Sequence, residues 1–497
     1  MTRTRRPTTR ILTTTSAVLP ALVTLVATVP TALAVAQERP QEPPLRTSEP
    51  VASIVADLES YIPERLREAG VPGLSIALVH NFEVAWSAGF GVKNVITGGE
   101  VTEGTVFEVA SISKVVTAYT ALRLVDQGRL SLDEPVAAYL REPWLPPSDW
   151  ADRITLRHLA SHSSGLTDRL LPTDKTVTFR PGTEFLYSGV GAMYVQEIIE
   201  RTTGQPLSRA AGEFVFEPLG MSSSNLVNTA AILRSMANGH MTYTLPLLTM
   251  LTAFVPSFVV LALLSVPVRR IRTGSWRPKG AWVAAAALAA ALATLVILSL
   301  TMGRVLPNVA VLNAAVGTGF AAALIGLTVI GRHFIARSAA ARQESGQRPV
   351  LVGIWATTCA VGLFLLSGSI HGPVPRGPSP RPSAVGTLRT AAPDLATFLI
   401  ELARSRYVSE QLSEQVRTPQ IRINSDYSWG LGPGIQHSEG GDALWQNGMT
   451  FGFRSVMVIY PEHGIGVVVL TNSERGFPLA YDVAARAIGG KDQLRYF

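Results

Sequence analysis

The chain has 497 residues, of which 47% are hydrophobic and only 16% are charged, and its formal net charge is +7. Soluble globular proteins usually carry about 25% charged residues, so we expect part of this chain to lie in lipid. The positive charge does not favour a nucleic-acid partner, because the arginines stand beside apolar runs and form no basic face interleaved with aromatic residues. The single cysteine, Cys359, excludes a disulfide framework within the chain.

The amino terminus has the pattern of an export signal. An arginine-rich start precedes an apolar stretch, residues 11–36, which ends in two A-x-A cleavage sites. We therefore predict a signal peptide over 1–36, with an uncleaved anchor helix as the alternative. Either one delivers the following residues outside the cytoplasm. Residues 37–49 are polar and Pro-rich, which predicts an extended linker.

Residues 50–243 have the pattern of the first part of a globular α/β domain. Helical spacing of apolar residues predicts a helix over 52–69. Two short β-type runs, 73–78 and 83–89, predict a hairpin. A second helical period extends over 107–128, with Ser111 near its start.

Four long apolar runs then interrupt the globular pattern between residues 244 and 371. Each is long enough to cross a hydrocarbon core of about 30 Å. The four runs cover residues 245–268, 281–303, 309–330 and 350–370. The first and third connecting loops are rich in arginine, whereas the second contains only Arg304, so the positive-inside rule places the two basic loops in the cytoplasm. We predict a bundle of four transmembrane helices with both ends on the outer side.

Because both ends of the bundle emerge on one side, the flanking segments can form a single domain. Residues 372–383 are rich in Pro and Gly and predict a second linker, and residues 384–497 resume the globular pattern. In that second part we expect a helix over 394–404, strands over 453–460 and 464–471, and a closing helix over 477–488.

The most reactive pattern is Ser111-Ile112-Ser113-Lys114. Residues three apart share a helix face, so the Ser111 hydroxyl and the Lys114 amine can meet. A serine needs an adjacent base to act as a nucleophile, and a lysine can be that base when its surroundings lower its pKa. By itself Ser-x-x-Lys occurs about once by chance in a chain of this length, and a solvated helix turn is the alternative.

Several ordered segments resemble the serine β-lactamase and penicillin-binding-protein superfamily. They are FEVASISKVVTAYTALRLVDQGRLSLDEPVAAYL, ITLRHLASHSSGL, FRPGTEFLYSGVGAMYVQEIIERTTG, FEPLGM, SAVGTLRTAAPDLATFL and WQNGMTFGFRSVMVIYPEHGIGVVVLTN. The resemblance is to the class C β-lactamase-like branch, which includes esterases and D-amino-acid peptidases. It implies an α/β (α+β) fold with an antiparallel sheet flanked by helices and a helical subdomain, here interrupted by the transmembrane bundle.

The resemblance also implies roles for particular residues. Ser111 would be the acylated nucleophile, Lys114 its proton acceptor, and Tyr187 the residue that shuttles protons. The strand Gln446-Asn447-Gly448 falls where the family has Lys-Thr-Gly or His-x-Gly. Gly448 would let the substrate backbone approach, and the N–H groups of Ser111 and Met449 would form the oxyanion hole.

Two positions depart from the family pattern. Gly189 stands where many members have Asn, and Gln446 stands where Lys or His is expected. Arg454 either supplies the missing positive charge or is an outward-facing strand residue. Both departures disfavour efficient β-lactam hydrolysis more than they disfavour general acyl hydrolysis.

Other chemistries lack support in the sequence. There is no Gly-x-Ser-x-Gly elbow, and the histidines show no metal-ligand spacing, so we expect no metal and no cofactor. His162 is expected to be a buried structural histidine.

The best-supported function is therefore a membrane-anchored extracytoplasmic serine hydrolase acting on an amide or ester. Its expected partners are a small-molecule or peptide substrate, peptidoglycan-derived or amphiphilic, and membrane lipid. The expected location is the bacterial cell membrane, as a multi-pass protein. One alternative is a membrane-bound D-amino-acid or prodrug peptidase, or a DD-peptidase-like enzyme. Another is a β-lactam-binding sensor or a catalytically silent binding module.

Overall fold

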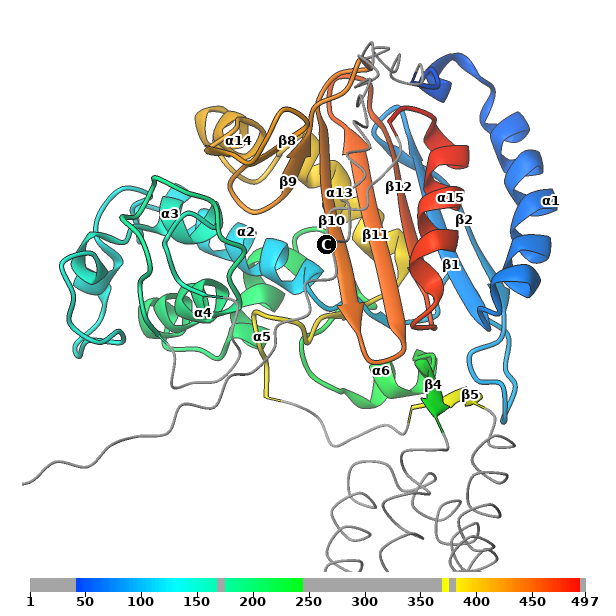
Figure 1. Cartoon of the computed structure of the whole chain (residues 1–497), viewed down its shortest axis with the longest axis horizontal. Coiled ribbons are helices and arrows are strands. Elements are labelled where there is room, and N and C mark those ends of the chain that lie inside the picture. The colour runs from blue at the N-terminus through cyan, green and yellow to red at the C-terminus, as the bar shows by residue number, and fades with distance from the viewer. Residues whose placement is uncertain (1–41, 168–174, 245–368, 375–380, 492–497) are drawn as a thin grey trace, which may run out of the picture. The chain divides into compact units, whose positions relative to one another are not determined.

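A computed structural model of the chain describes residues 42–167, 175–244, 369–374 and 381–491. Within these ranges, eight strands form one antiparallel sheet in the order β2-β1-β12-β11-β10-β9-β8-β7 (Figure 1). The strands are β1 (Gly73–His80), β2 (Glu83–Gly91), β7 (Ile421–Arg422), β8 (Tyr427–Trp429), β9 (Gly434–Gln436), β10 (Ala443–Thr450), β11 (Phe453–Tyr460) and β12 (Ile465–Thr471).

The sheet joins strands from both sides of residues 245–368. β1 pairs with β12 in a register that sets Leu74 opposite Thr471. Every residue of β12, and every residue of β1 before His80, is buried. Strands buried on both faces carry near-continuous apolar runs, and both of these strands have a neighbouring strand on each side.

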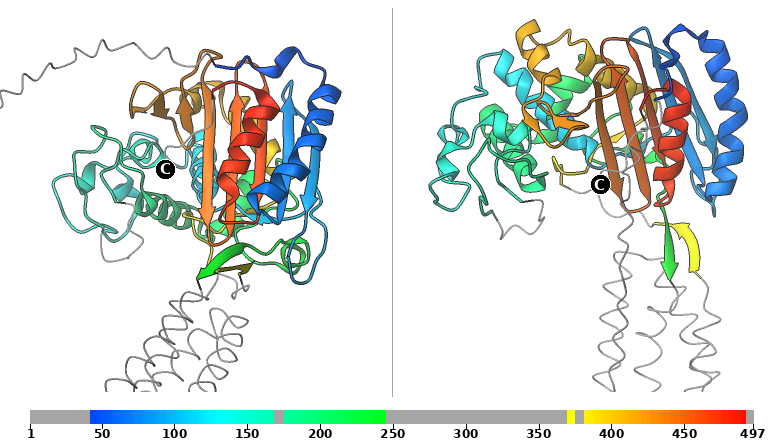
Figure 2. Two further views of the ribbon diagram at one scale, coloured as in Figure 1. Left: turned by 45° about the vertical axis from the view of Figure 1, so that its right-hand side comes forward. Right: turned by 45° about the horizontal axis from the view of Figure 1, so that its top comes forward.

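Helices cover both faces of the sheet. α1 (Val51–Ala69) and α15 (Gly476–Ile488) pack on one face, and α13 (Ala392–Ala403) packs on the other (Figures 1 and 2). α1 follows the apolar period of the sequence, burying Ile54 and Leu58 among others, and it ends at Gly70, whose φ of 62° is the left-handed conformation that glycine adopts readily.

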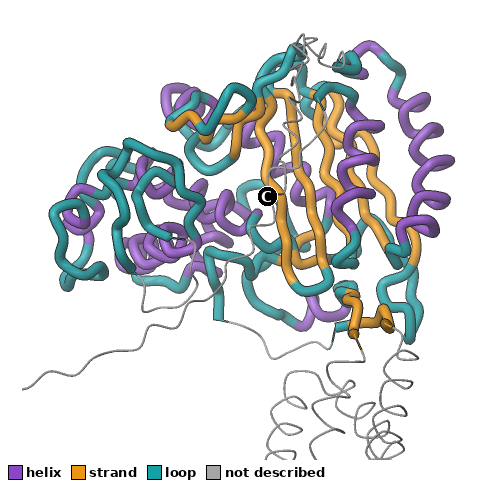
Figure 3. The backbone as a smooth tube through the Cα atoms, viewed as in Figure 1, coloured by secondary structure: helices purple, strands orange, loops and turns teal. Residues whose placement is uncertain are grey.

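A helical subdomain lies beside the β7 end of the sheet (Figure 3). It contains α2 (Ile112–Asp126), η2 (Val136–Tyr139), η3 (Ala151–Arg153), α3 (Leu156–Ala160), α4 (Gly189–Thr203), α5 (Leu207–Ala211) and the π-helical turn η4 (Gly212–Phe216). The remaining described helices are η1 (Arg46–Ser48), α6 (Ala230–Ser235) and α14 (Glu410–Arg417).

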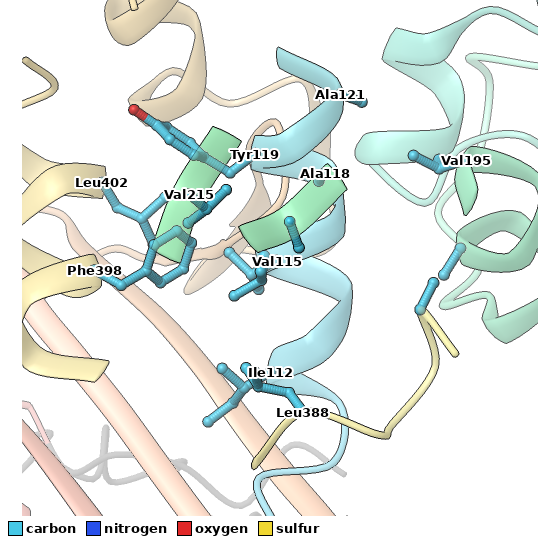
Figure 4. Close-up of a cluster of buried hydrophobic side chains, with 14 of the residues drawn as sticks. Ile112, Val115, Ala118, Tyr119, Ala121, Val195, Val215, Leu388, Phe398 and Leu402 are labelled. Carbon is cyan, nitrogen blue, oxygen red and sulfur yellow. The ribbon is translucent and has the colours of Figure 1, made fainter. Parts of the chain in front are cut away.

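α2 is apolar around nearly its whole circumference and is buried accordingly. Phe398 and Leu402 of α13 lie on one side of it, and Val195 of α4 lies on the other (Figure 4). Tyr119 of α2 makes an edge-on contact with Phe398, with ring centroids 5.7 Å apart. This packing holds the amino-terminal end of α2 at the edge of the sheet.

Two short sheets connect segments that are far apart in the sequence. β3 (Phe107–Glu108) pairs with β6 (Arg389–Thr390), and β4 (His240–Thr244) pairs with β5 (Ser369–Pro373). The second pair brings together the two points where the chain leaves and re-enters the described region.

Most of the predicted outer elements are confirmed within one or two residues, but the helix over 107–128 begins later than predicted. Residues 107–108 form β3, Ala110 has a φ of 46°, and α2 starts at Ile112. The apolar residues there continue the helical period, yet their backbone groups pair with β6.

The predicted linker over 372–383 is also wrong at its start. Gly372 and Pro373 belong to β5, where they pair with Met241 and His240. Ser369 and Ile370, the last residues of the fourth predicted span, belong to the same strand. The apolar run in the sequence does not show where β5 begins, because the start of this strand is set by its pairing with β4.

The predicted transmembrane bundle otherwise lies outside the described residues, as does the predicted signal over 1–36. Among the helices that the structure describes, none combines the length and the apolar character needed to cross a bilayer.

Candidate active site

Ser111 sits at the junction between β3 and α2. It is the N-cap residue of α2, and its own φ and ψ are helical. The residue before it, Ala110, is held in the left-handed region, which is uncommon for a residue with a Cβ atom and is concentrated at functional sites. This sharp turn presents the Ser111 side chain at the helix start, where it is partly exposed.

Lys114 occupies the position predicted for the base. Its Nζ atom lies 3.0 Å from Oγ of Ser111. The side chain is only 6% exposed, and it lines a small pocket together with His162. The three-residue spacing therefore delivers the contact that the sequence predicted.

A segment from beyond residues 245–368 completes the surroundings of Lys114. Its Nζ atom donates a second hydrogen bond of 3.2 Å to the carbonyl oxygen of Val385. The same segment is fixed by Ser113, whose Oγ accepts from the backbone N–H of Leu388 at 2.9 Å and donates to the carbonyl of Ala110 at 2.6 Å. Ser113 thus ties the turn before Ser111 to the segment that holds the lysine.

Tyr187 lies beside the lysine, as predicted. Nζ of Lys114 is 4.9 Å from the centroid of the Tyr187 ring. The ring also packs against His162 and Trp429, with centroid separations of 4.4 and 5.6 Å. Ser188, which follows Tyr187, caps α4 by accepting a hydrogen bond of 2.7 Å from the N–H of Gly191.

His162 is buried, which confirms that prediction. Its Nδ1 atom accepts a hydrogen bond of 3.2 Å from the backbone N–H of Ser188, so the ring supports the segment that carries Tyr187. Burial, with the nearby Lys114 charge as the second cause, lowers the pKa of His162 to about 3. The ring is therefore neutral at physiological pH.

Gln446 faces Tyr187 from β10. Its Nε2 atom donates to the carbonyl oxygen of Asn447 at 2.8 Å and to the Tyr187 hydroxyl at 3.4 Å. The amide is 3% exposed, and its Oε1 atom has no hydrogen-bond partner. A neutral donor thus stands next to the phenol at the position where the sequence resemblance led us to expect a cation.

Gly448 brings β10 close to the nucleophile. A Cβ atom built on Gly448 would lie 2.1 Å from the carbonyl oxygen of Val109, two residues before Ser111. Only glycine permits this approach of the two backbones. It brings the backbone that includes Met449 next to the turn carrying Ser111, as an oxyanion hole requires.

Arg454, another predicted site residue, makes its contacts away from the approach of β10 to the Ser111 turn. Arg454 pairs with Met449 across the β10–β11 ladder, donates to the carbonyls of Thr450 and Phe453, and lies 5.4 Å from the ring centroid of Phe477. Burial lowers the pKa of Arg454. These contacts support the strand-residue alternative for Arg454.

Asn447 donates from Nδ2 to the hydroxyl of Tyr481 on α15 at 3.0 Å, which directs its side chain to the α15 face. Gly189 is buried as the first residue of α4 and, lacking a side chain, offers no amide to a substrate.

A second serine is hydrogen-bonded in the order of a catalytic triad. Ser428 Oγ lies 2.8 Å from Nε2 of His437, whose Nδ1 lies 2.8 Å from Oδ1 of Asp442. However, Ser428 is only 2% exposed on β8, so a substrate carbonyl cannot reach its hydroxyl. This arrangement is a structural network, and Ser428 serves as a control serine for Ser111.

Sequence reasoning missed Val385, Ser113 and Trp429. Val385 acts through its carbonyl oxygen, which no side-chain pattern reveals. Ser113 lies inside the quoted motif, but the sequence does not show that it is buried and bonded to the segment around Leu388.

Comparison with known proteins places these features in a family. A model described as Beta-lactamase matches residues 58–315 and 338–491. Esterase EstB of Burkholderia gladioli is 30% identical over 207 residues, which are 36% of this chain and 53% of the relative. A Beta-lactamase of Pseudomonas fluorescens is 28% identical, over 33% of this chain and 48% of the relative. The chain thus spans about half the length of these curated relatives.

Solved structures share the fold. A penicillin-binding protein homologue from Pyrococcus abyssi superposes with a TM-score of 0.54 at 20% identity, covering 87% of this chain and 76% of that one. The D-alanine carboxypeptidase AmpC from Burkholderia cenocepacia gives 0.53 at 16% identity, covering 87% and 99%. The predicted β-lactamase-like α/β fold, with a sheet flanked by helices, is confirmed.

Proposed function

The chain belongs to the β-lactamase family, and we propose that it is a serine hydrolase that cleaves an ester or amide through an acyl-enzyme on Ser111. The observation that carries this proposal is the 3.0 Å contact between Lys114 Nζ and Ser111 Oγ, within a largely buried site. The esterase, the β-lactamase and a putative D-alanyl-D-alanine carboxypeptidase of Escherichia coli O157:H7 among the relatives support it.

Acylation transfers one proton and exchanges one bond. The neutral Lys114 amine accepts the Ser111 proton while Oγ attacks the substrate carbonyl carbon. The carbonyl oxygen gains negative charge, which the N–H groups of Ser111 and Met449 stabilise. The bond to the leaving group then breaks, and Tyr187 hands the departing alcohol or amine a proton that Lys114 replaces.

Deacylation reverses these roles with water. Tyr187 first passes its proton to Lys114, and the resulting phenolate takes a proton from water while the water oxygen attacks the acyl carbon. The protonated Lys114 is then the source of the proton that Ser111 recovers. The ester bond to Ser111 breaks, and Oγ recovers its proton. Gln446 favours the phenolate because its Nε2 donates to the Tyr187 oxygen.

The substrate is a simple ester or amide in preference to a β-lactam. Gly189 supplies no side-chain amide for an acylamide group, and Gln446 supplies no positive charge for a substrate carboxylate. The membrane-bound peptidase alternative uses the same chemistry and differs only in the leaving group.

We further propose that the protein is attached to the bacterial cell membrane and acts on its outer side. This rests on the apolar runs between 244 and 371 and on the export pattern over 1–36. The folded domain is then built from residues 50–243 and 384–497, with membrane lipid as its partner.

Intact-protein mass spectrometry tests the covalent step. The full-length protein is mixed with a series of p-nitrophenyl esters, a D-amino-acid amide and nitrocefin, then quenched in acid. We expect the mass of the acyl group to be added to the wild type and not to Ser111→Ala, with esters reacting faster than nitrocefin. No adduct with any compound would favour a silent binding module.

A further inference from the structure

Exposed apolar side chains gather at one end of the molecule. Large hydrophobic residues with more than a third of their surface exposed are few in the described chain, and five of the seven share this end. They are Val95 (48% exposed), Ile96 (73%), Leu233 (38%), Met449 (62%) and Phe451 (73%), which we call the apolar rim. The other two lie in connecting segments elsewhere, Trp150 just before η3 and Tyr407 between α13 and α14.

The rim residues come from three segments that meet at the start of β4. The backbone N–H of Val95 lies 3.2 Å from Nε2 of His240. The N–H of His240 donates to the carbonyl of Gly452, next to Phe451, at 3.2 Å. Leu233 lies on α6, which precedes β4 in the chain. Figures 1 and 2 show α6, the β10–β11 turn and β4–β5 together at this end.

The position of the rim indicates what it faces. The chain leaves the described region after Thr244 and returns at Ser369, opposite each other in the β4–β5 ladder. Residues 245–368 between them carry the predicted membrane spans. An apolar surface close to the points where the chain enters and leaves such spans is expected at the bilayer interface.

Two exposed basic residues beside the rim are also consistent with contact to a lipid bilayer. Arg234 and Arg475 are both exposed, and Nη2 of Arg475 lies 3.1 Å from Oγ1 of Thr242 on β4. Basic residues at the edge of an apolar surface pair with anionic lipid headgroups while the apolar side chains enter the acyl region.

We propose that the apolar rim is a lipid-contact surface that inserts into the outer interface of the bilayer. It rests on the proposed membrane attachment and deepens it. Phe451 stands three residues after Gly448, in the turn that follows β10, so it lies within about 10 Å of the strand position that packs against the nucleophile turn. The rim therefore sets the mouth of the site at the membrane surface.

Depth-dependent fluorescence quenching tests this on the full-length protein. Cys359→Ser removes the native thiol, and Ile96→Cys, Phe451→Cys or Trp150→Cys then receives a polarity-sensitive fluorophore. Trp150 is the matched control, being an exposed apolar residue outside the rim. The proteins are reconstituted in phosphatidylcholine–phosphatidylglycerol vesicles that contain shallow nitroxide lipids, and iodide is the aqueous quencher.

Labels at 96 and 451 should be quenched by the lipid nitroxide at least about twofold more than the label at 150, and less by iodide. If the protein floats with the vesicles but lipid quenching is equal at all three sites, the rim does not contact lipid. The proposed membrane attachment would still stand. Labels at 96 and 451 shielded from both quenchers would mean that protein covers the rim, a second copy or residues 245–368, and would also overturn the lipid contact. Protein that does not float with the vesicles contradicts the membrane attachment as well.

Discussion

Lys114 donates a hydrogen bond of 3.2 Å to the carbonyl oxygen of Val385, a residue 271 positions further along the chain. The two lie on opposite sides of residues 245–368, so the site is complete only when both outer segments have folded together. The contact fixes the amine in one direction while its other side meets Ser111 at 3.0 Å. A lysine held in this way needs little reorganisation to accept a proton.

Replacing Lys114 should remove the base without removing the nucleophile. We expect Lys114→Ala to lower kcat/KM for an activated ester by about 10²–10⁴-fold. Lys114→Arg should be nearly as damaging, because a guanidinium is not deprotonated in proteins. Steady-state kinetics with p-nitrophenyl acetate measures this, and an Arg variant with wild-type activity would rule out a proton-accepting role.

Gly448→Ala should disrupt the approach of β10 to the nucleophile turn. The new Cβ atom would lie 2.1 Å from the carbonyl of Val109, so one of the two backbones has to move. We expect a loss of about 1–3 kcal/mol in stability and a large fall in kcat, because the oxyanion hole widens.

Gly104→Ala is the matched control, since a Cβ atom there meets nothing within 4 Å. The unfolding temperature of Gly104→Ala and its rate of ester hydrolysis should be close to those of the wild type. If Gly448→Ala behaved in the same way, β10 could not contribute to the site as described.

His162 predicts a specific dependence of stability on pH. Its pKa is about 3 in the folded protein and near 6.5 when unfolded, so the unfolded chain binds more protons between these values. The contribution of His162 is fully present above pH 6.5 and is lost as the pH falls toward 3, by about 1.4 kcal/mol per pH unit in that window.

Replacing the ring with His162→Asn should make the profile shallower between pH 4 and 6.5, because His162 no longer gains a proton on unfolding. His158, whose pKa burial also lowers, keeps part of the slope. Unfolding in detergent at several pH values measures the slope. His463→Asn serves as the control, because His463 is exposed and should leave the slope unchanged. A His162→Asn slope equal to that of the wild type would contradict a buried neutral histidine.

The apolar rim should matter for substrates carried by lipid. We expect Phe451→Ser with Ile96→Ser to lower kcat/KM for a long-chain acyl ester in vesicles by about tenfold, the cost of withdrawing an apolar side chain from lipid. Hydrolysis of a water-soluble acetyl ester should be unchanged, because neither residue contacts Ser111. Equal losses on both esters would point to a damaged site instead of a lost lipid contact.

Local patterns in the sequence predicted many of the elements. The apolar period of α1 and the β-type runs of β11 and β12 placed these elements within one or two residues, because each buries a continuous face. The start of α2 was mispredicted because Phe107–Glu108 pairs with residues 389–390, a non-local contact that periodicity does not encode.

The site was predictable where side chains act at a fixed local spacing. Ser111 and Lys114 share one turn, so their contact follows from the helix itself. Tyr187 and Gly448 were located by resemblance alone. The placement of Arg454 on the α15 side depends on the register of β10 with β11, and the role of Val385 depends on a backbone oxygen; neither leaves a mark in the sequence.

Covalent labelling of two serines tests whether Ser111 is the nucleophile. Ser111 and Ser428 both have a basic partner within 3.0 Å, but only Ser111 is accessible. Full-length wild type, Ser111→Ala and Ser428→Ala are treated with a fluorescent fluorophosphonate and compared by in-gel fluorescence. We expect equal labelling of the wild type and Ser428→Ala and none of Ser111→Ala. Undiminished labelling of Ser111→Ala would contradict it.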